Sequence, residues 1–223
     1  MSGEADDEGE LDAEEGSGSV EDTHDAIMGA TYRALCKHGY AHLTMQDIAD
    51  EFDKSRPLLH YHYDTKEELM LAFVDNMIGW VGGQLAESET EDPLDRMEEY
   101  VDGFVIDPTE EDRETFGLAL LELRVQALHN EQFREKLAVH YQNNVETAAE
   151  IITDGIEAGV FREVDPEEVG EFIYTSLVGA RIYQVTMGAE HASRRMRDNL
   201  AAFVVDDLLV DGRTTDEYSG EGW

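Results

Sequence analysis

The chain has 223 residues, of which 41% are hydrophobic, so it is long enough to bury a core in one or two domains. Lys and Arg together number 16 against 52 Asp and Glu, which gives a formal net charge of −36. No apolar run reaches the roughly 18 residues of a membrane span. The acidic first 22 residues contain no Lys or Arg, so we expect no signal peptide there. The single cysteine excludes a disulfide scaffold.

The excess of acids has two interpretations. It marks either an acidic domain that binds a partner, such as a mimic of nucleic acid, or a protein that works in molar salt. At 1 M salt the Debye length falls to about 3 Å, so unbalanced surface charges repel one another little. Because the acids occur on nearly every expected helix and form no single block, we favour the second interpretation. The composition resembles that of proteins from halophilic archaea.

The composition divides the chain into four segments. Residues 1–22 and 211–223 are acidic and poor in apolar residues, so we expect a disordered tail and a flexible tail there. Residues 23–65 are expected to form a small domain of three short helices, and residues 66–210 a larger helical domain.

The small domain begins with an apolar repeat at helical spacing from Ile27 to Leu35, and Gly39 follows as a stop signal. Thr44 and Ser55 stand in N-cap position for the second and third helices, because both side chains can accept a hydrogen bond from the first helical turn.

The larger domain is predicted from its helix caps. Thr65 and Glu68 form a capping box, while Asp92 and Asp165 each precede a proline at the first helical position. The other long helices are expected at about 109–128, 131–158, 166–187 and 191–210. No alternating pattern of strand length occurs, so the fold class is all-α.

Residues 43–70 have the layout of a helix-turn-helix, whose second helix enters the major groove of DNA. Residues 26–46 contain no carboxylate in 21 positions, where about five are expected, and residues 54–63 contain none either. A surface that approaches phosphates cannot tolerate carboxylates. Burial is the alternative explanation, and we prefer it for a third acid-free run at 172–189. In 54–63 the basic and polar content favours contact with DNA.

The same stretch resembles a known family. The pattern Thr44-x3-Ile48-Ala49, Ser55, Leu59-His60-Tyr61-His62-Tyr63 and Thr65-Lys66-Glu67-Glu68-Leu69 is similar to that of the TetR/AcrR transcriptional regulators. The resemblance covers about residues 27–70, and the rest of the chain agrees with the family only in length and helix content. It implies an N-terminal helix-turn-helix domain of three helices followed by a helical domain for effector binding and dimerisation.

The resemblance also implies roles for single residues in DNA binding. Thr44 and Lys66, at helix N-termini, would contact phosphates. The residues expected along the recognition helix are Ser55, Arg56, Pro57, His60 and Tyr61. Arg56 is the candidate for bidentate recognition of a guanine.

A small-molecule effector is implied as a second partner, bound between the helices of the larger domain. The candidates for its pocket, each of which also fits a core position, are Trp80, Phe104, Phe116, Leu120, Arg124, Tyr141 and Tyr174. The last two helices would form the homodimer, and two-fold symmetry would then require a near-palindromic double-stranded DNA operator. We expect the effector to act by shifting the helix that links the two domains.

The sequence therefore predicts a cytoplasmic, ligand-responsive, sequence-specific transcriptional regulator, with a repressor favoured. The alternatives are a helical ligand-binding or scaffold protein that has lost DNA binding and, with no motif in its support, a helical-bundle enzyme. We expect no enzymatic activity, no cofactor and no membrane partner. We also expect no metal, because His60 and His62 would lie about 200° apart around a helix.

Overall fold

The computed structural model describes residues 15–86, 90–105, 111–202 and 206–210, without the side chains of 15–22, 78–86, 111–114, 116 and 206. The prediction of an all-α fold is confirmed. Within the described residues the regular elements are helices, and the one pairing of β type joins Phe161 to Leu209 as an isolated bridge.

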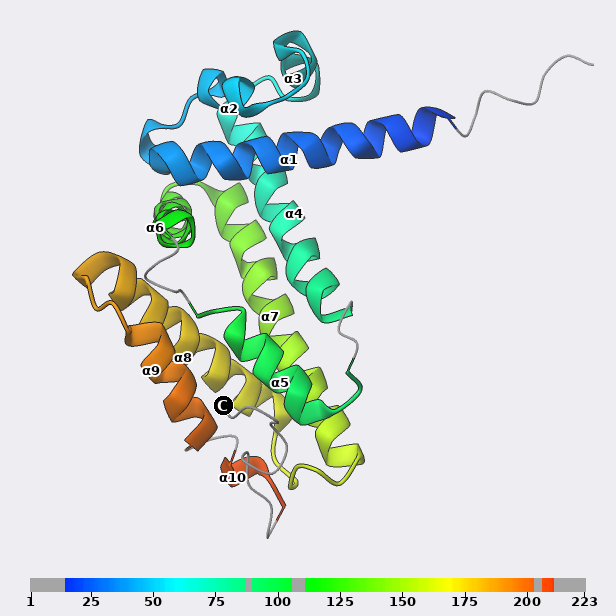
Figure 1. Cartoon of the computed structure of the whole chain (residues 1–223), viewed down its shortest axis with the longest axis vertical. Helices are drawn as coiled ribbons and strands as arrows, with labels where there is room; N and C mark the ends of the chain where they lie inside the picture. Colours follow the sequence, from blue (N-terminus) through cyan, green and yellow to red (C-terminus); the bar gives the residue numbers. More distant parts are fainter. Residues whose placement is uncertain (1–14, 87–89, 106–110, 203–205, 211–223) are drawn as a thin grey trace, which may run out of the picture.

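Four helices build the N-terminal end of the molecule: α1 (Glu15–His42), α2 (Met45–Glu51), α3 (Arg56–His62) and α4 (Lys66–Ala86). Figure 1 shows α1 lying across the molecule, with α2 and α3 on its outer side and the larger domain on its inner side. Helix α4 passes α1 and enters the larger domain, so it connects the two parts.

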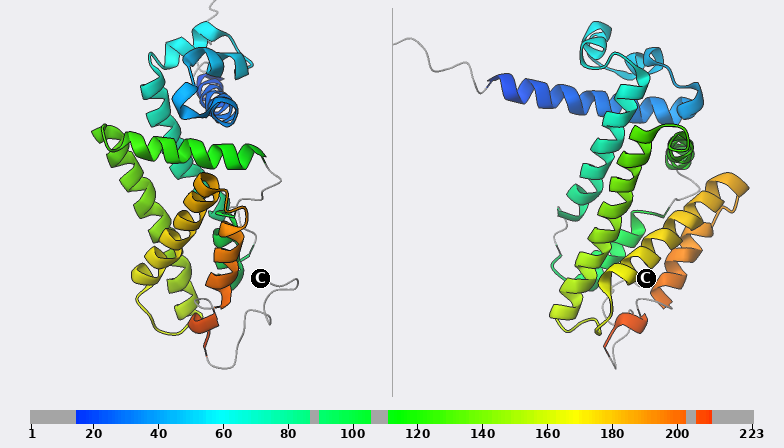
Figure 2. Two further views of the ribbon diagram at one scale, coloured as in Figure 1. Left: turned by 90° about the vertical axis from the view of Figure 1, so that its left-hand side faces the viewer. Right: turned by 180° about the vertical axis from the view of Figure 1, so that it is seen from behind.

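The larger domain contains α5 (Pro93–Asp102), α6 (Glu111–Gln126), α7 (Glu131–Glu157), α8 (Pro166–Met187), α9 (Ala192–Leu200) and α10 (Asp206–Leu208). Helix α6 lies directly beneath α1, and α7 and α8 run away from it towards the far end (Figure 2). Helix α6 is therefore the layer between the N-terminal helices and the rest of the larger domain.

Side-chain caps explain where the long helices begin. The Asp92 carboxylate accepts a hydrogen bond from the backbone N–H of Leu94 at 2.8 Å, and Asp165 accepts one from Glu167 at 3.1 Å. Both predicted caps are confirmed. Asn130, which the sequence analysis did not single out, caps α7 in the same way through the N–H of Gln132 at 2.9 Å.

The first helix is longer than expected at both ends. It begins at Glu15, inside the range 1–22 expected to be a disordered tail, because no proline interrupts the helical register and acids favour a helix N-terminus. At the other end Gly39 leaves the helical conformation with φ 64°, as a stop signal should, but a further helical turn follows up to His42. Residues 1–14 and 211–223 lie outside the described residues.

The single helix expected at 191–210 is wrong. Helix α9 ends at Leu200, and residues 203–205 lie outside the described residues. The segment after α10 instead pairs with the loop that follows α7, where the Val210 N–H donates to the Val160 carbonyl at 3.1 Å. This pairing brings Leu208 and Leu209 into the core, and a continuous helix could not form it.

Two apolar clusters hold the fold together. The first combines α1–α4 with buried residues of α6 and α7, so the N-terminal helices share their core with the larger domain. The second joins α5, α7, α8 and α9 with Leu208 and Leu209. The Gly170 backbone lies so close to α7 that a Cβ there would stand 3.0 Å from the Val145 carbonyl oxygen, which explains the close packing of α7 on α8.

Candidate functional site

The first helix of the helix-turn-helix is fixed at its start by a reciprocal cap. The Thr44 N–H donates to the Asp47 carboxylate at 2.8 Å, and the Asp47 N–H donates to the Thr44 hydroxyl at 3.2 Å. The Thr44 hydroxyl and the Thr44 N–H both donate hydrogen bonds to the Asp47 carboxylate, and these bonds lower its pKa. Thr44 is exposed, as a phosphate contact requires, but its hydroxyl also donates to Asp47 within this cap.

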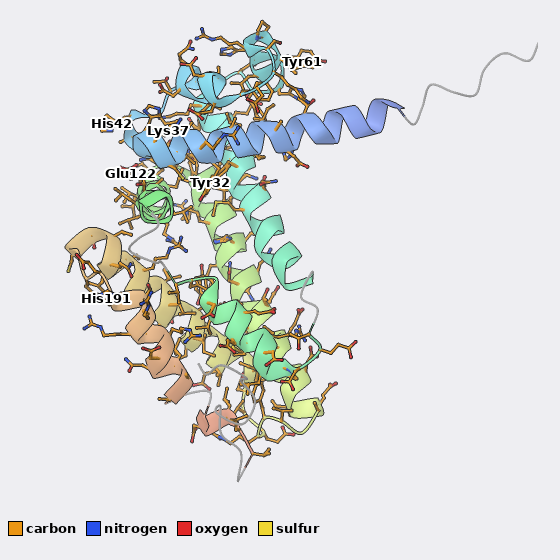
Figure 3. The ribbon with its side chains drawn as sticks, in the orientation of Figure 1. Tyr32, Lys37, His42, Tyr61, Glu122 and His191 are labelled. Carbon is orange, nitrogen blue, oxygen red and sulfur yellow. The ribbon has the colours of Figure 1, made fainter. Side chains whose placement is uncertain are left out.

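Basic residues of α1 support the other end of α2. The Arg33 guanidinium donates to the backbone carbonyl of Glu51 at 2.9 Å, and the Lys37 ammonium lies 2.6 Å from the Glu51 carboxylate. The hydrogen bond from Lys37 keeps the pKa of Glu51 below its ordinary value. Both cations of the first acid-free run therefore position α2 (Figure 3 labels Lys37).

Helix α3 is held by one apolar residue and exposed over the rest of its surface. Leu59 is fully buried against the first core, whereas the five residues expected along the recognition helix, Ser55, Arg56, Pro57, His60 and Tyr61, are all exposed. Tyr61 is 84% exposed and lies at the outer end of the molecule (Figure 3). Arg56 forms no hydrogen bond or ion pair with any other residue that the structure describes, so its guanidinium is available to a ligand.

Two further predictions about this domain need adjustment. Ser55 occupies the N-cap position of α3, but its side chain makes no capping hydrogen bond. Lys66 is half-buried, and its ammonium donates to the Tyr40 carbonyl at 3.1 Å while lying 4.4 Å from the centre of the Tyr40 ring. Burial lowers the pKa of Lys66, and nearby Glu122 partly offsets this. Lys66 therefore joins α4 to the end of α1 in this structure.

A contact that the sequence analysis missed links α6 to the DNA-binding end. The Glu122 carboxylate accepts a hydrogen bond from the Ala41 N–H at 3.1 Å, and it lies next to Gly39, where a Cβ would come within 3.4 Å of it. Glu122 is placed on the side of α6 that faces α1 (Figure 3). Ala41 and Glu122 are 81 positions apart in the sequence, so no local pattern signals the contact.

A pocket of 270 Å³ lies on the opposite side of α6, where α6, α7 and α8 meet. Its lining residues are Arg124, Leu137, His140, Tyr141, Tyr174, Thr175, Val178, Gly179 and Ile182. The volume is close to the lower end of the ~300–1,000 Å³ typical of small-molecule sites. The pocket suits a small ligand with an apolar body.

The polar groups of the pocket are arranged around Arg124. A side-chain hydrogen bond joins Arg124 to Tyr174. Burial raises the pKa of the Tyr174 hydroxyl, and the Arg124 guanidinium lowers it by a smaller amount. His140 is buried, and its pKa is lowered to about 4, first by burial and then by the charges of Arg124 and Arg181. His140 is therefore neutral at pH 7. At the edge of the pocket the Tyr141 hydroxyl donates to Glu171.

The pocket contains three of the seven residues expected there, Arg124, Tyr141 and Tyr174. Phe104 does not line it but packs edge-on against Tyr174, with ring centres 5.6 Å apart. Leu120 does not line the pocket either, because it is buried in the first core. Trp80 and Phe116 belong to α4 and α6, but their side chains lie outside the described part of the chain.

Most of the lining that the sequence analysis missed comes from one face of α8. Thr175, Val178, Gly179 and Ile182 follow helical spacing, but the same spacing also describes a core-facing helix. In the structure Thr175 is exposed and the other three are half-buried, and the core face of α8 carries Ile173 and Leu177 instead, so only the tertiary structure distinguishes the two cases.

The other face of α8 corrects the interpretation of residues 172–189 as a buried run. Phe172, Tyr183 and Met187 are 55%, 56% and 71% exposed. Eleven residues make about three helical turns, so these side chains lie along one stripe of the helix. An exposed apolar stripe on a surface otherwise rich in acids is typical of a protein interface.

Neither a metal cluster nor a membrane-spanning helix occurs within the described ranges. No group of three or more His, Cys, Asp or Glu side chains is placed to hold a metal ion there. No helix among these residues combines the length and the apolar character needed to span a membrane.

Helix α3 is exposed and free of acids, and it is held on the other N-terminal helices. A helical domain that contains a pocket lies behind them. This arrangement defines a helix-turn-helix protein with a second, regulatory domain. Residues 27–73 match the family model described as bacterial regulatory proteins of the tetR family, and residues 93–209 match the model of the C-terminal domain of BetI-type transcriptional repressors. The chain belongs to the TetR family of DNA-binding transcriptional regulators. The family resemblance is thereby confirmed, and the family consists of regulators and not of enzymes.

Solved structures agree with this assignment. A TetR transcription regulator from Haloarcula marismortui is 35% identical, with a TM-score of 0.74 over 85% of this chain and 100% of that chain. A putative transcriptional regulator from Saccharomonospora viridis, solved in complex with choline, has a TM-score of 0.69 over 85% of this chain and 99% of that chain. At 21% identity it shows the fold alone.

Curated relatives match over a shorter stretch. An HTH-type transcriptional regulator from the lacX 3' region of Lactococcus lactis is 30% identical over 89 residues, 38% of this chain and 44% of that protein. The probable HTH-type transcriptional regulator ArpR of Pseudomonas putida is 33% identical over 78 residues, 35% of this chain and 37% of that protein. The chain thus spans less than half the length of these relatives.

Proposed function

We propose that this protein is a cytoplasmic, ligand-responsive repressor that binds a near-palindromic DNA operator as a homodimer. The exposed, acid-free surface of α3 on a chain of net charge −36 carries this proposal. A partner that repels carboxylates, as DNA does, explains why ten consecutive residues lack acids while nearly all of them reach the surface. The BetI-type repressor domain matched by the C-terminal residues supports the repressor role.

The exposed stripe of α8 supports a homodimer. Phe172, Tyr183 and Met187 would be covered by the same stripe of a second subunit, because a two-fold axis brings identical faces together. The α9 helix contributes less to this surface, since its Arg197 pairs with Asp102 and Glu98 of α5 within the subunit. Two recognition helices held about 34 Å apart would then meet successive major grooves on one side of the duplex.

Helix α6 supports a path for the ligand response in addition to the α4 movement expected from the sequence. Glu122 contacts the end of α1, and Arg124, two positions later, lines the pocket. Residues two apart on a helix point about 200° away from each other, so α6 offers one face to the ligand and the other to the DNA-binding end. A ligand shifts the spacing of the recognition helices only if it binds one arrangement more tightly than the other.

Molar salt weakens each phosphate contact, with a slope of about −0.9 in log affinity against log salt per phosphate. We propose that base contacts from α3 and cations bound between the acidic surface and the DNA compensate. A slope as steep as that of ordinary repressors, with no binding left at about 2 M KCl, would contradict this part of the proposal.

Selection from random double-stranded DNA tests the function. The full chain is incubated with the DNA pool in about 3 M KCl, where surface charge is screened, and bound sequences are read after several rounds. We expect an enriched near-palindrome with half-sites one helical turn apart. If no sequence is enriched although the protein is folded and dimeric, the alternative of a helical ligand-binding protein that has lost DNA binding replaces the proposal.

A further inference from the structure

The pocket between α6, α7 and α8 differs from the rest of the molecule in its charge. Of its nine lining residues none is Asp or Glu, whereas the frequency of acids in the chain, 52 in 223, predicts about two. Its ionisable lining groups are Arg124, His140, Tyr141 and Tyr174. An ordinary apolar pocket would explain the lack of acids but not the presence of an arginine.

Arg124 also differs from three cations that join other helices of the larger domain to their neighbours. Arg96 pairs with Asp154, Lys136 with Asp75 and Arg197 with Asp102, so each of these contacts between helices is neutralised by a carboxylate. Among the described residues no carboxylate forms an ion pair with Arg124, whose one recorded partner is the neutral hydroxyl of Tyr174. In a protein with more than three acids for each base, a half-buried guanidinium without a carboxylate partner suits an anionic ligand.

The surrounding charges have the same sign. After burial, the charges that lower the pKa of His140 are those of Arg124 and Arg181, so the charged groups acting on this side chain are positive. Glu171, which lies outside the lining, accepts a hydrogen bond from the Tyr141 hydroxyl.

The shape of the pocket limits the ligand further. Leu137, Val178 and Ile182 offer an apolar wall, and the rings of Tyr141 and Tyr174, whose centres are 5.5 Å apart, offer an aromatic one. A fork of guanidinium donors matches the two oxygens of a carboxylate.

We infer that the effector is a small organic anion, a carboxylic acid with an apolar body, whose carboxylate pairs with Arg124 and whose body lies against Leu137, Val178 and Ile182. This inference deepens the proposed function and rests on it only in naming the ligand an effector. A quaternary ammonium ligand would gain ~0.5–2 kcal/mol from the aromatic rings, but it would have to approach an uncompensated guanidinium. The geometry therefore favours the anion over a cation of the same size.

Calorimetric titration of the full chain with matched probes tests the inference. The acids are hexanoate, benzoate and phenylacetate, each compared with its own amide, and the cation is benzyltrimethylammonium. All titrations use about 3 M KCl, so that chloride competes equally in every arm. We expect at least one acid to bind about tenfold or more tightly than its amide, and the cation not to bind measurably. If no acid binds more tightly than its amide, or the cation binds more tightly than every acid, the inference is overturned.

Substitutions at Arg124 test whether its guanidinium causes the preference for the acid. Arg124→Gln should weaken binding of the preferred acid by about ten- to a hundredfold, while its amide is affected little. Arg124→Lys keeps the charge but loses the fork and should retain part of the preference. Arg134→Gln, at an exposed arginine of α7 paired with Glu131, is the matched control and should bind as the wild type does. An Arg124→Gln protein that is folded by circular dichroism and keeps the full preference for the acid would also overturn the inference.

The two proposals fail separately. Binding of the acid is measured on the free protein, so it does not depend on any operator. If an acid binds but no DNA is selected, the ligand class stands and the proposed regulator does not. If DNA is selected but no acid is preferred over its amide, the regulator stands and the ligand class does not.

Discussion

The backbone N–H of Ala41 donates a hydrogen bond to the Glu122 carboxylate at 3.1 Å, and this bond joins the helix-turn-helix end of the chain to the helix that carries Arg124 of the pocket. Glu122 also lies beside Gly39, the residue at which α1 leaves its helical conformation with φ 64°. One carboxylate of α6 thus holds the end of α1 immediately before the helix-turn-helix begins.

Replacing Glu122 by Ala should lower the free energy of unfolding by about 0.5–1.5 kcal/mol, the usual net contribution of one hydrogen bond. Glu122→Gln keeps an oxygen acceptor for the Ala41 N–H and should cost less. Urea denaturation at constant KCl measures both. An equal loss for Gln and for Ala would show that the charge, and not the hydrogen bond, is what stabilises this contact.

Replacing Gly155 by Ala should destabilise the protein by about 1–3 kcal/mol, the range found for overpacked cores. A Cβ at Gly155 would come within 1.9 Å of the ring of Phe161, which is itself 2% exposed. Ordinarily Ala in place of Gly in a helix stabilises it by up to about 1 kcal/mol. Denaturant midpoints measure the difference.

Gly29→Ala in α1 is the matched control for this prediction, because a Cβ there meets only the flexible end of the Arg33 side chain at 3.4 Å. It should leave the stability unchanged or raise it. If both variants shift the midpoint in the same direction, the close contact between Gly155 and Phe161 does not limit the packing of α7.

Acidification should cost the protein stability through His140. Its pKa is about 4 in the folded chain, below the ordinary 6.5, so the unfolded chain takes up the proton first as the pH falls. The free energy of unfolding is unaffected by His140 above pH 6.5. It falls by about 3 kcal/mol between pH 6.5 and about pH 4. Unfolding free energies at a series of pH values, compared between the wild type and His140→Gln, isolate this contribution from that of the many carboxylates.

His129→Gln, at an exposed histidine just before α7, is the control for the pH series. It should follow the wild-type curve. A His140→Gln protein with the same pH dependence as the wild type would mean that the pKa of His140 does not change on folding, contrary to its buried position.

Replacing Arg56 by Ala should cost about 1–3 kcal/mol in operator binding and relax the preference at one base pair. The guanidinium is exposed on α3 and forms no hydrogen bond or ion pair with other described residues, so the loss would arise in the complex and not in the free protein. Fluorescence anisotropy with the selected operator and single-base variants measures it. Arg134→Ala, at the exposed arginine of α7, is the control; a uniform loss over all sequences would assign Arg56 to a phosphate instead of a base.

Desalting should unfold the protein. With a formal charge of −36, self-repulsion rises as the Debye length grows from about 3 Å at 1 M to about 30 Å at 0.01 M salt. We expect the helical circular dichroism signal to fall between about 3 M and about 20 mM KCl. An unchanged signal over this range would favour the other interpretation of the acids, a surface that binds a partner.

Local sequence determined the helix-turn-helix domain. Its residues lie within about 45 positions of one another, and the caps at Thr44 and Thr65 and the stop at Gly39 act within one or two helical turns. The same holds for Asp92 and Asp165, whose side chains bond to N–H groups two residues away. Caps of this kind depend on neighbours in the chain, so they are visible without a structure.

The pocket, the contact between α6 and α1 and the exposed stripe of α8 were decided only by the tertiary structure. Arg124 and Tyr174 stand 50 positions apart, Ala41 and Glu122 stand 81 apart, and neither spacing carries a signal along the chain. The acid-free run at 172–189 shows the reason most clearly. Its composition predicts burial, but only one side of the helix, with Ile173, Leu177 and Ala180, packs into the core, while Phe172 and Tyr183 stay on the surface.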